Sequence, residues 1–316
     1  MRRLLQGLCL VAFVLLFFWL TPPKPHASQL SFEPTFQWAP AFLLCLIDPL
    51  AAFAAFIASR ALSLLLLVPT AVLLSALVFG RAFCSHVCPL GTLLDVVGIA
   101  SRKSSGPPMP KLRFIKTALL VAVLACALLG LGLAGLVTPM PILVRGLRAG
   151  EAAARGTAVF PLWLVLLGGI LMLSLVRKRF WCNVLCPSGA LLSLISRFSL
   201  YKRVRTDACV SCGRCVDVCD FDAIRTDDFT TTTDCTTCGA CAPACPVDAI
   251  AYRTSLKPLP VKPTRRDFLA GACVTAGVLA TTLPSVIGRT RTLLRPPGAL
   301  PGDDFLARCV RCGLCA

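Results

Sequence analysis

The sequence predicts an all-α membrane bundle of four spans, duplicated two plus two, followed by a small α+β domain. Three observations support this prediction. Hydrophobic residues make up 56% of the 316 residues and charged residues only 15%, unlike a soluble domain of this size. Apolar runs close to the roughly 20 residues that cross a bilayer recur along the chain. Residues 207–252 lose these runs, and Asp and Thr appear instead.

Four apolar runs are predicted to span the membrane, namely residues 4–20, 61–79, 112–137 and 160–176. Lys and Arg beside these runs place the N-terminus, the loop after Phe79 and everything after Val176 in the cytoplasm. The stretches near 21–38 and 138–159 then lie outside. A weaker apolar segment, residues 268–288, is predicted to be a fifth span that carries the tail to the periplasm. The predicted location is the bacterial inner (cytoplasmic) membrane, with multiple passes.

The formal charge of +17 has two interpretations, nucleic-acid binding and membrane orientation. Most Lys and Arg residues, Arg81 and Arg179 among them, flank apolar runs, which indicates positive-inside orientation and contact with anionic lipid. No aromatic-rich basic module accompanies the charge, so nucleic acid is not an expected partner.

Each half of the bundle contains an outer segment broken by proline. Asp48-Pro49 is typical of a helix start, with Asp as N-cap and Pro at the first helical position. Asp48 could instead accept a proton, because carboxylates inside membranes are often functional. Thr138-Pro139 occupies the equivalent place in the second half. We therefore predict an internal duplication whose two parallel repeats are related by an axis along the membrane normal.

Four of the 19 cysteines stand alone in apolar runs and are predicted to pack there as small hydrophobic residues: Cys9, Cys45, Cys126 and Cys273. Two C-x3-C-P motifs contain Cys84, Cys88, Cys182 and Cys186. At helical spacing the two cysteines of each motif share a face, and the pseudo-two-fold axis could bring all four thiols together. A shared metal or Fe–S centre, redox dithiols and packing thiols all remain open. The packing interpretation is disfavoured, because both motifs share the longer pattern aromatic-Cys-x3-Cys-Pro-x-Gly.

Residues 209–219 and 235–245 both have the spacing C-x2-C-x2-C-x3-C, the run found in bacterial two-cluster ferredoxins. The fourth cysteine of each run ligates the other cluster. This predicts two [4Fe–4S] clusters, cluster 1 on Cys209, Cys212, Cys215 and Cys245 and cluster 2 on Cys235, Cys238, Cys241 and Cys219. Zinc does not use eight cysteines at this spacing, and a reducing cytoplasm disfavours disulfides. Asp220 stands where these ferredoxins usually have Pro, which affects the turn or the potential of cluster 2 but removes no ligand.

The C-terminal part resembles the start of an exported protein. Residues 264–269 read TRRDFL and match the twin-arginine pattern, which directs folded proteins across the membrane. Cys309, Cys312 and Cys315 then supply three of the four ligands of another ferredoxin motif, an incomplete third site that stops at Ala316. We expect the natural chain to continue with further motifs of this kind.

These features divide the chain into a four-span membrane domain, a two-cluster ferredoxin domain, a linker, a twin-arginine signal or anchor, and the start of a truncated second ferredoxin module. Their boundaries are 1–200, 201–254, 255–263, 264–290 and 291–316.

Over residues 1–252 the chain resembles the membrane polyferredoxin family. The four spans, the segments GRAFCSHVCPLGTLLD and KRFWCNVLCPSGALL, the outer DPL segment and the trailing ferredoxin carry the resemblance. The family includes NapH-type and MauN-type membrane components of quinol dehydrogenases, and relatives that serve reductase maturation or copper reduction. The resemblance implies electron transfer between the quinone pool, Fe–S centres and a periplasmic redox partner. The C-terminal part resembles a NapG/MauM-type exported ferredoxin fused to its membrane partner.

Three functions are compatible with these residues. The first is electron transfer from quinol through [4Fe–4S] clusters to a periplasmic reductase, which the twin-arginine segment favours. The second is a copper reductase or maturation factor that uses the C-x3-C-P thiols. A redox sensor is the third, and it is disfavoured because no effector domain is evident. The chain has only two histidines, His26 and His86, so a bis-histidine di-haem relay is excluded. His86 is either a solvated interface residue or a base in a quinol site.

Overall fold

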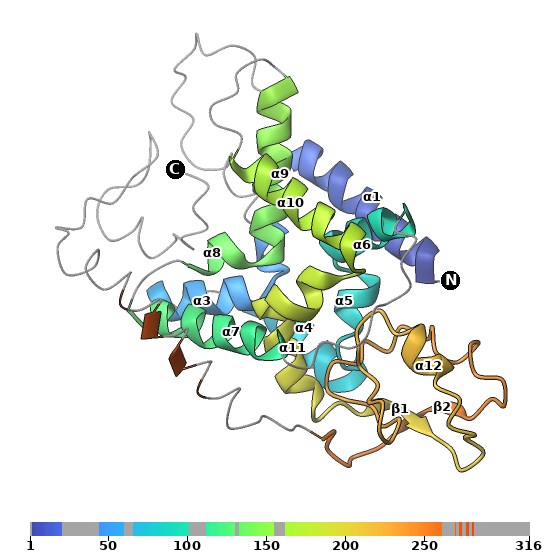
Figure 1. The fold of residues 1–316 in the computed structure, drawn as a ribbon. Helices are drawn as coiled ribbons and strands as arrows, with labels where there is room; N and C mark the ends of the chain where they lie inside the picture. The colour runs from blue at the N-terminus through green and yellow to red at the C-terminus, as the bar shows by residue number, and fades with distance from the viewer. Residues whose placement is uncertain are drawn as a thin grey trace, which may run out of the picture.

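The computed structural model describes residues 2–20, 44–59, 66–100, 112–129, 133–154 and 162–260, with isolated residues at 269, 272–273, 276–277 and 280. The twin-arginine pair, His26 and the three cysteines of the incomplete third site lie outside the described residues. The described chain forms a helical domain and a small domain with a two-stranded sheet, and the small domain lies against the helical domain near α5 (Figure 1).

The helical domain repeats one order of elements in its two halves. The first half contains α1 (Arg2–Leu20), α3 (Pro49–Ser59), α4 (Leu67–Phe79), α5 (Ala82–His86) and α6 (Pro89–Ala100). The second contains α7 (Arg113–Leu128), α8 (Ala134–Val137), α9 (Pro139–Ala154), α10 (Leu162–Val176), a π-helix (Trp181–Leu185) and α11 (Pro187–Ser196). The elements of the first half, in order, match α7, α9, α10, the π-helix and α11.

The two halves interlock through the helices that follow the C-x3-C-P motifs. Helix α6 packs against α10 of the second half, and α11 packs against α4 of the first half. Each of these helices also packs against the first helix of its own half, α6 on α1 and α11 on α7. This reciprocal packing is what two repeats related by a pseudo-two-fold axis produce.

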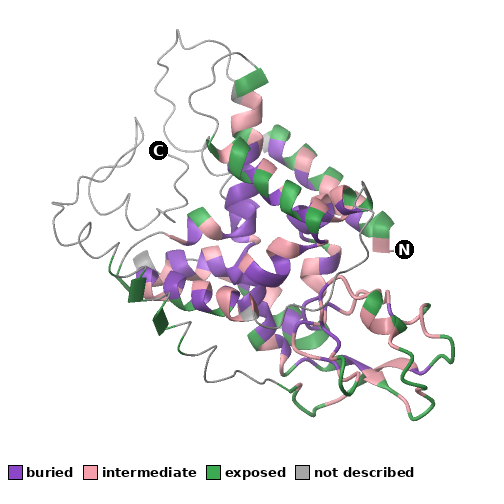
Figure 2. Ribbon diagram, in the orientation of Figure 1, coloured by how far each residue is buried: buried purple, intermediate pink, exposed green. Residues whose placement is uncertain are grey.

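Helices occupy all four predicted apolar runs. By length and composition, one helix in the described residues is a candidate to cross a membrane, the segment Arg2–Trp19 of α1. Helices α4, α7 and α10 are apolar but shorter, with 13, 16 and 15 described residues. Figure 2 shows many exposed residues along α1 and α10. These exposed residues include large apolar side chains such as Leu4, Val165 and Val176, each at least 66% exposed.

Proline starts four of the helices, α3, α6, α9 and α11. Proline suits this position because its missing N–H would have no partner in the first turn. The predicted N-cap of α3 is confirmed, since Asp48 Oδ1 accepts a hydrogen bond from the Leu50 amide at 3.1 Å. Thr138 behaves differently, because its hydroxyl donates back to the Ala134 carbonyl at 2.8 Å and closes the end of α8.

The small domain pairs β1 (Tyr201–Arg205) with β2 (Ile250–Thr254) in an antiparallel sheet with Tyr201 opposite Thr254, and it adds the short helix α12 (Arg214–Asp217). Its core includes Phe221, Ala223 and Ala249, each at most 2% exposed. The two alanines come from the repeated tripeptide Asp-Ala-Ile, 26 residues apart. The tandem repeat of the sequence is therefore also a repeat of buried positions.

Gly91 allows helix α6 to start close to the Cys84 carbonyl of its own motif and to Arg179 of the second half. A Cβ atom at Gly91 would lie 2.8 Å from the Cys84 carbonyl oxygen and 3.3 Å from Arg179 Nη1. We expect Gly91→Ala to destabilise the protein by about 1–3 kcal/mol, because a buried backbone atom must move. Gly98→Ala in the same helix is the control, since its nearest neighbour, Lys178 Cγ, would lie at an ordinary 3.5 Å. Thermal unfolding of the purified full chain measures both, and an equal midpoint for the two variants would contradict the close approach.

Candidate metal centres

The two cysteine runs of the small domain adopt the same backbone conformation. Three pairs of residues, each pair 26 positions apart, have positive φ: Ser211 and Thr237, Gly213 and Gly239, and Asp222 and Asp248. Positive φ is uncommon outside glycine. Its repetition at equivalent Ser, Thr and Asp positions indicates that the two repeats share one backbone geometry. Both runs bend between their first three cysteines, which are the three predicted to bind the same cluster.

The fourth cysteine of each run also has an equivalent surrounding. The Ala223 amide donates to Cys219 Sγ at 3.4 Å, and the Ala249 amide donates to Cys245 Sγ at 3.2 Å. Hydrogen bonds from backbone amides to sulfur are a feature of protein-bound Fe–S clusters. The predicted ligands of both clusters are free thiols, and Cys212 is exposed while Cys241 is buried. Burial raises the pKa of Cys219 to about 11 and that of Cys235 to about 12, so metal binding must displace their protons.

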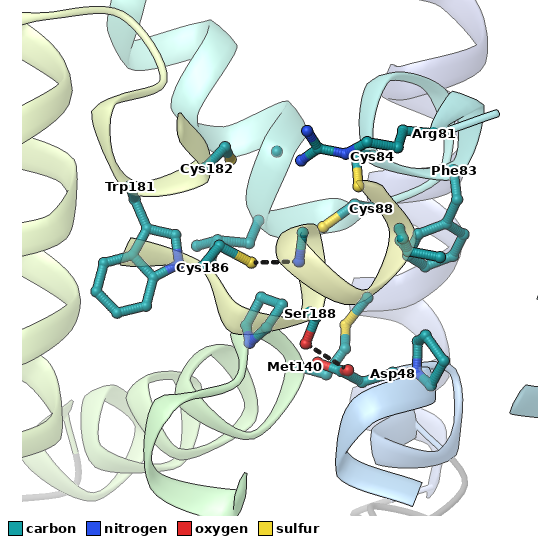
Figure 3. A pocket seen from close by; sticks show the side chains of 16 residues that line it. Asp48, Arg81, Phe83, Cys84, Cys88, Met140, Trp181, Cys182, Cys186 and Ser188 are labelled. Carbon is teal, nitrogen blue, oxygen red and sulfur yellow. Dashed lines mark hydrogen bonds between the residues drawn. The ribbon is translucent and has the colours of Figure 1, made fainter. Parts of the chain in front are cut away.

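The structure brings the two C-x3-C-P motifs to one pocket. Figure 3 shows Cys84, Cys88, Cys182 and Cys186 around this pocket, together with Arg81 and Trp181. We call it the four-cysteine pocket. Three of the four cysteines are buried, and Cys84 is half-buried. Both halves of the duplicated chain therefore contribute to a single site.

Each motif departs from the regular α-helical turn at its second cysteine, whereas the sequence predicted helical spacing throughout. The Cys88 amide donates to the Phe83 carbonyl and the Cys186 amide to the Trp181 carbonyl, both at 2.9 Å and five residues back. Proline explains the bend, because the residue before proline is pushed out of the helical region. Cys186 has extended backbone angles, φ −74° and ψ 108°. The second cysteine thus ends one helix and precedes the next.

The N-termini of four helices converge on the four-cysteine pocket. Residues at the starts of α3, α6, α9 and α11 line it, among them Pro49, Leu90, Met140 and Ser188. A helix N-terminus carries partial positive charge and exposes unpaired amides, so it favours anions. None of the four helices has an acidic residue in its first turn to offset this charge. Asp48, which caps α3 and accepts from the Ser188 hydroxyl at 2.7 Å, is the carboxylate on the pocket wall.

Two buried arginines add to this positive charge. Arg81 is 1% exposed, and its Nη1 lies 2.6 Å from Asp234 Oδ1 of the small domain. Arg179 is 0% exposed, and its Nε donates to Asp95 Oδ1 at 2.6 Å. Burial would raise the pKa of Asp95, but the hydrogen bonds and charge of Arg179 hold it below its ordinary value, so the pair stays ionised at neutral pH. Sequence analysis counted both arginines as lipid-flanking charges, and the structure overturns that interpretation.

Some buried donors at the pocket have no acceptor among the described residues. They are Arg81 Nε, Arg81 Nη2 and Trp181 Nε1. Leaving a buried donor unpaired is unfavourable, so the pocket is built for an acceptor or an anion. In the described part of the chain, no three His, Cys, Asp or Glu side chains converge closely enough for one metal ion. A thiolate-ligated Fe–S cluster would supply negative charge and sulfur acceptors for the unpaired donors of Arg81 and Trp181.

His86 is not among the residues that line the four-cysteine pocket. Its Nδ1 lies 2.7 Å from Ser85 Oγ, and the ring is half-buried at the domain junction. Sequence analysis missed Arg81, Arg179 and Trp181 as site residues. A signal was available for the arginines, because each stands three residues before the first cysteine of its motif.

Comparison with known proteins matches both cysteine regions. A family described as "4Fe-4S binding domain" matches residues 60–108 and 159–205, which hold the C-x3-C-P motifs. A second family with the same description matches residues 202–225 and 231–251, which hold the longer runs. These matches indicate an iron–sulfur protein of the ferredoxin type.

Three of the similar proteins have names that describe them as ferredoxin-type. The "Methylamine utilization ferredoxin-type protein MauN" of Paracoccus denitrificans is 35% identical over 147 residues, 45% of this chain and 49% of that protein. The "Ferredoxin-type protein NapH" of Escherichia coli is 28% identical over 200 residues, 51% of this chain and 64% of that protein. The "Methylamine utilization ferredoxin-type protein MauM" of Methylorubrum extorquens is 48% identical over 63 residues, 18% of this chain and 29% of that protein.

The chain is similar to the ferredoxin-type proteins MauN and NapH over about half of its length. It spans about half the length of MauN. No solved structure is significantly similar to the chain.

Asp234 holds the small domain on the helical domain. Its carboxylate binds Arg81 and also Lys116, and all three side chains are buried. We expect Asp234→Asn to destabilise the protein by about 3–5 kcal/mol, because two buried cations lose their partner. Asp227→Asn, at an exposed pair with Arg225, is the control and should change little. Thermal unfolding distinguishes them, and an unchanged midpoint for Asp234→Asn would show that the junction does not depend on this ion pair.

Proposed function

We propose that the protein is a membrane-bound iron–sulfur electron carrier that takes electrons from quinol and delivers them to a periplasmic reductase, as the membrane component of a quinol dehydrogenase. The observation that carries the proposal is the joining of two kinds of cysteine site in one fold. A pocket with four thiols lies next to a domain with two ferredoxin-type cysteine runs. Kinship with MauN and NapH supports the same role.

The cysteines would hold three groups. Cys209, Cys212, Cys215 and Cys245 suit cluster 1, and Cys235, Cys238, Cys241 and Cys219 suit cluster 2. Cys84, Cys88, Cys182 and Cys186 would share a third cluster between the two halves of the helical domain. When bound, such clusters accept and donate single electrons, which lets a two-electron donor such as quinol be oxidised in two steps. The chain positions these sites, excludes water from the four-cysteine pocket and supplies compensating positive charge.

The membrane would be crossed by α1, α4, α7 and α10. Their apolar composition and the exposed apolar side chains of α1, α4 and α10 support this. Basic residues beside the runs favour a cytoplasmic ferredoxin domain in the inner membrane. The twin-arginine segment and Cys309, Cys312 and Cys315 would belong to a periplasmic ferredoxin partner fused to this chain, consistent with the match to MauM.

The alternative is a copper reductase or a maturation factor for a respiratory metalloenzyme. Thiols are good ligands for Cu(I), and four of them line one pocket. The unpaired donors of Arg81 and Trp181 and the four helix N-termini at the pocket favour an anionic cluster over a single cation. We therefore rank the alternative second.

Iron content tests whether the four-cysteine pocket holds one shared cluster. We expect Cys84→Ser and Cys182→Ser each to lose about four iron atoms and four sulfides per anaerobically purified chain, because either half is needed for the site. Cys126→Ala is the control, since Cys126 is fully buried in α7 and away from the pocket. Iron and acid-labile sulfide assays measure this. Equal iron in the wild type and both serine variants would overturn the shared cluster.

Reduction by quinol tests the electron source. We expect a menaquinol analogue to bleach the Fe–S absorbance of the full chain in detergent, and Cys84→Ser to slow this bleaching at least tenfold. Dithionite should still bleach the ferredoxin clusters of that variant. Absence of bleaching by quinol in the wild type would refute the quinol proposal, and tight Cu(I) binding lost in both serine variants would favour the alternative.

A further inference from the structure

The ferredoxin domain contacts the helical domain through the two segments that carry ligands of cluster 2. Thr236 follows Cys235, and its carbonyl accepts from the Ser85 hydroxyl at 2.9 Å. Thr237 donates to the Phe79 carbonyl at 3.1 Å. These contacts place the Cys235 loop against α5, the helix that carries Cys84.

The second ligand segment of cluster 2 makes equivalent contacts with the other motif. The Asn183 side-chain amide, next to Cys182, donates to the Asp220 carbonyl at 2.9 Å. Arg177 pairs with Asp222 at 2.6 Å. Cys219 precedes this segment, so the two segments that carry the predicted ligands of cluster 2 each contact one half of the helical domain beside a C-x3-C-P motif. In contrast, Cys212 of cluster 1 is exposed, and its neighbour Val210 is 61% exposed.

Arg81 lies between the four-cysteine pocket and the Cys235 loop. Its Nη1 pairs with Asp234, the residue before Cys235. Its Nη2 lies against Gly189 on the pocket side, where a Cβ atom would come within 2.7 Å of it. The Gly189 amide in turn donates to Cys186 Sγ at 3.3 Å. Because Lys116 shares the same carboxylate, this buried group has two cations for one anion.

Arg179 repeats this arrangement from the other half. Its guanidinium lies 4.4 Å from the ring centroid of Phe221, two residues after Cys219. Its Nη1 donates to the Cys84 carbonyl at 3.0 Å and would lie 3.3 Å from a Cβ atom on Gly91. Asp95, its partner, is also shared with a second cation, Arg2, at 2.8 Å. Each arginine therefore touches one motif of the pocket and one ligand segment of cluster 2.

We infer that Arg81 and Arg179 are quasi-symmetric positioning residues that electrostatically couple the four-cysteine pocket to cluster 2 and not to cluster 1. The inference rests on the proposed cluster in that pocket. A buried positive charge between two anionic groups stabilises both, and each group's negative charge opposes reduction of the other, because the interior screens charge weakly. The charge in the pocket then sets the reduction potential of cluster 2, which makes cluster 2 the neighbour in electron exchange.

The test is a redox titration of the anaerobic full chain in detergent, followed by electron paramagnetic resonance. Cys212→Ser and Cys238→Ser assign the signals of clusters 1 and 2. We expect Arg81→Gln and Arg179→Gln each to disfavour reduction of cluster 2 about tenfold, which for one electron is about 59 mV, and to leave cluster 1 unchanged. Arg81→Lys should restore most of the potential, because it keeps the charge. Arg225→Gln, at an exposed pair of the same domain, is the matched control.

Emptying the pocket gives a second, independent measurement. Cys84→Ser should make cluster 2, and not cluster 1, easier to reduce, since a nearby negative charge is removed. An equal shift of both clusters, or the same shift in Arg81→Lys and Arg81→Gln, would overturn the coupling and leave a structural role only. Failure of the proposed cluster would be seen separately, as no loss of iron in Cys84→Ser. A shift of cluster 2 alone in the glutamine variants, with iron content unchanged, would support the inference.

Discussion

The buried ion pair between Arg81 and Asp234 is the interaction on which the rest of this structure depends. A guanidinium that is 1% exposed is strongly unfavourable unless a carboxylate compensates it. Asp234 belongs to the ferredoxin domain, so the charge of Arg81 in the helical domain is compensated only when the two domains are docked. Lys116 and Ser193 meet the same carboxylate and tie it to α7 and α11. Docking of the two domains is therefore part of folding and not a loose association.

Duplication turns this junction into a nearly symmetric one. Proline ends each C-x3-C-P motif and forces a new helix, so the second cysteine stands at a helix start and not within a helix. These two helix starts meet those of α3 and α9 at the pocket, and an arginine from each half packs on a glycine of the other. One pocket with four thiols results, lined by four helix N-termini, by Arg81 and by the carboxylate of Asp48. A largely buried site with unpaired donors is suited to hold an anionic centre.

The ferredoxin domain is also built from a repeat, but from a shorter one. Two runs with matching positive φ angles and matching amide-to-sulfur hydrogen bonds present two sets of thiols that differ mainly in their surroundings. The Cys235 loop and the Cys219 segment rest on the helical domain, whereas Cys212 is exposed. Docking of the two domains therefore places two locally equivalent cysteine sites in different environments. Different environments would give two similar clusters different roles.

The sequence by itself determined the elements whose cause is local. The spacing of the two cysteine runs predicted the ferredoxin domain and its eight ligands, the apolar runs predicted the helices, and Asp48-Pro49 predicted the start of α3, because these depend on neighbours along the chain. Only the tertiary structure decided that Arg81 and Arg179 are buried, that α6 and α11 pack against helices of the opposite half, and that the Cys235 and Cys219 segments contact the helical domain. Those features depend on contacts between residues that are far apart in the sequence, 37 positions for Asn183 with Asp220 and 153 for Arg81 with Asp234, and no local pattern of residues encodes them.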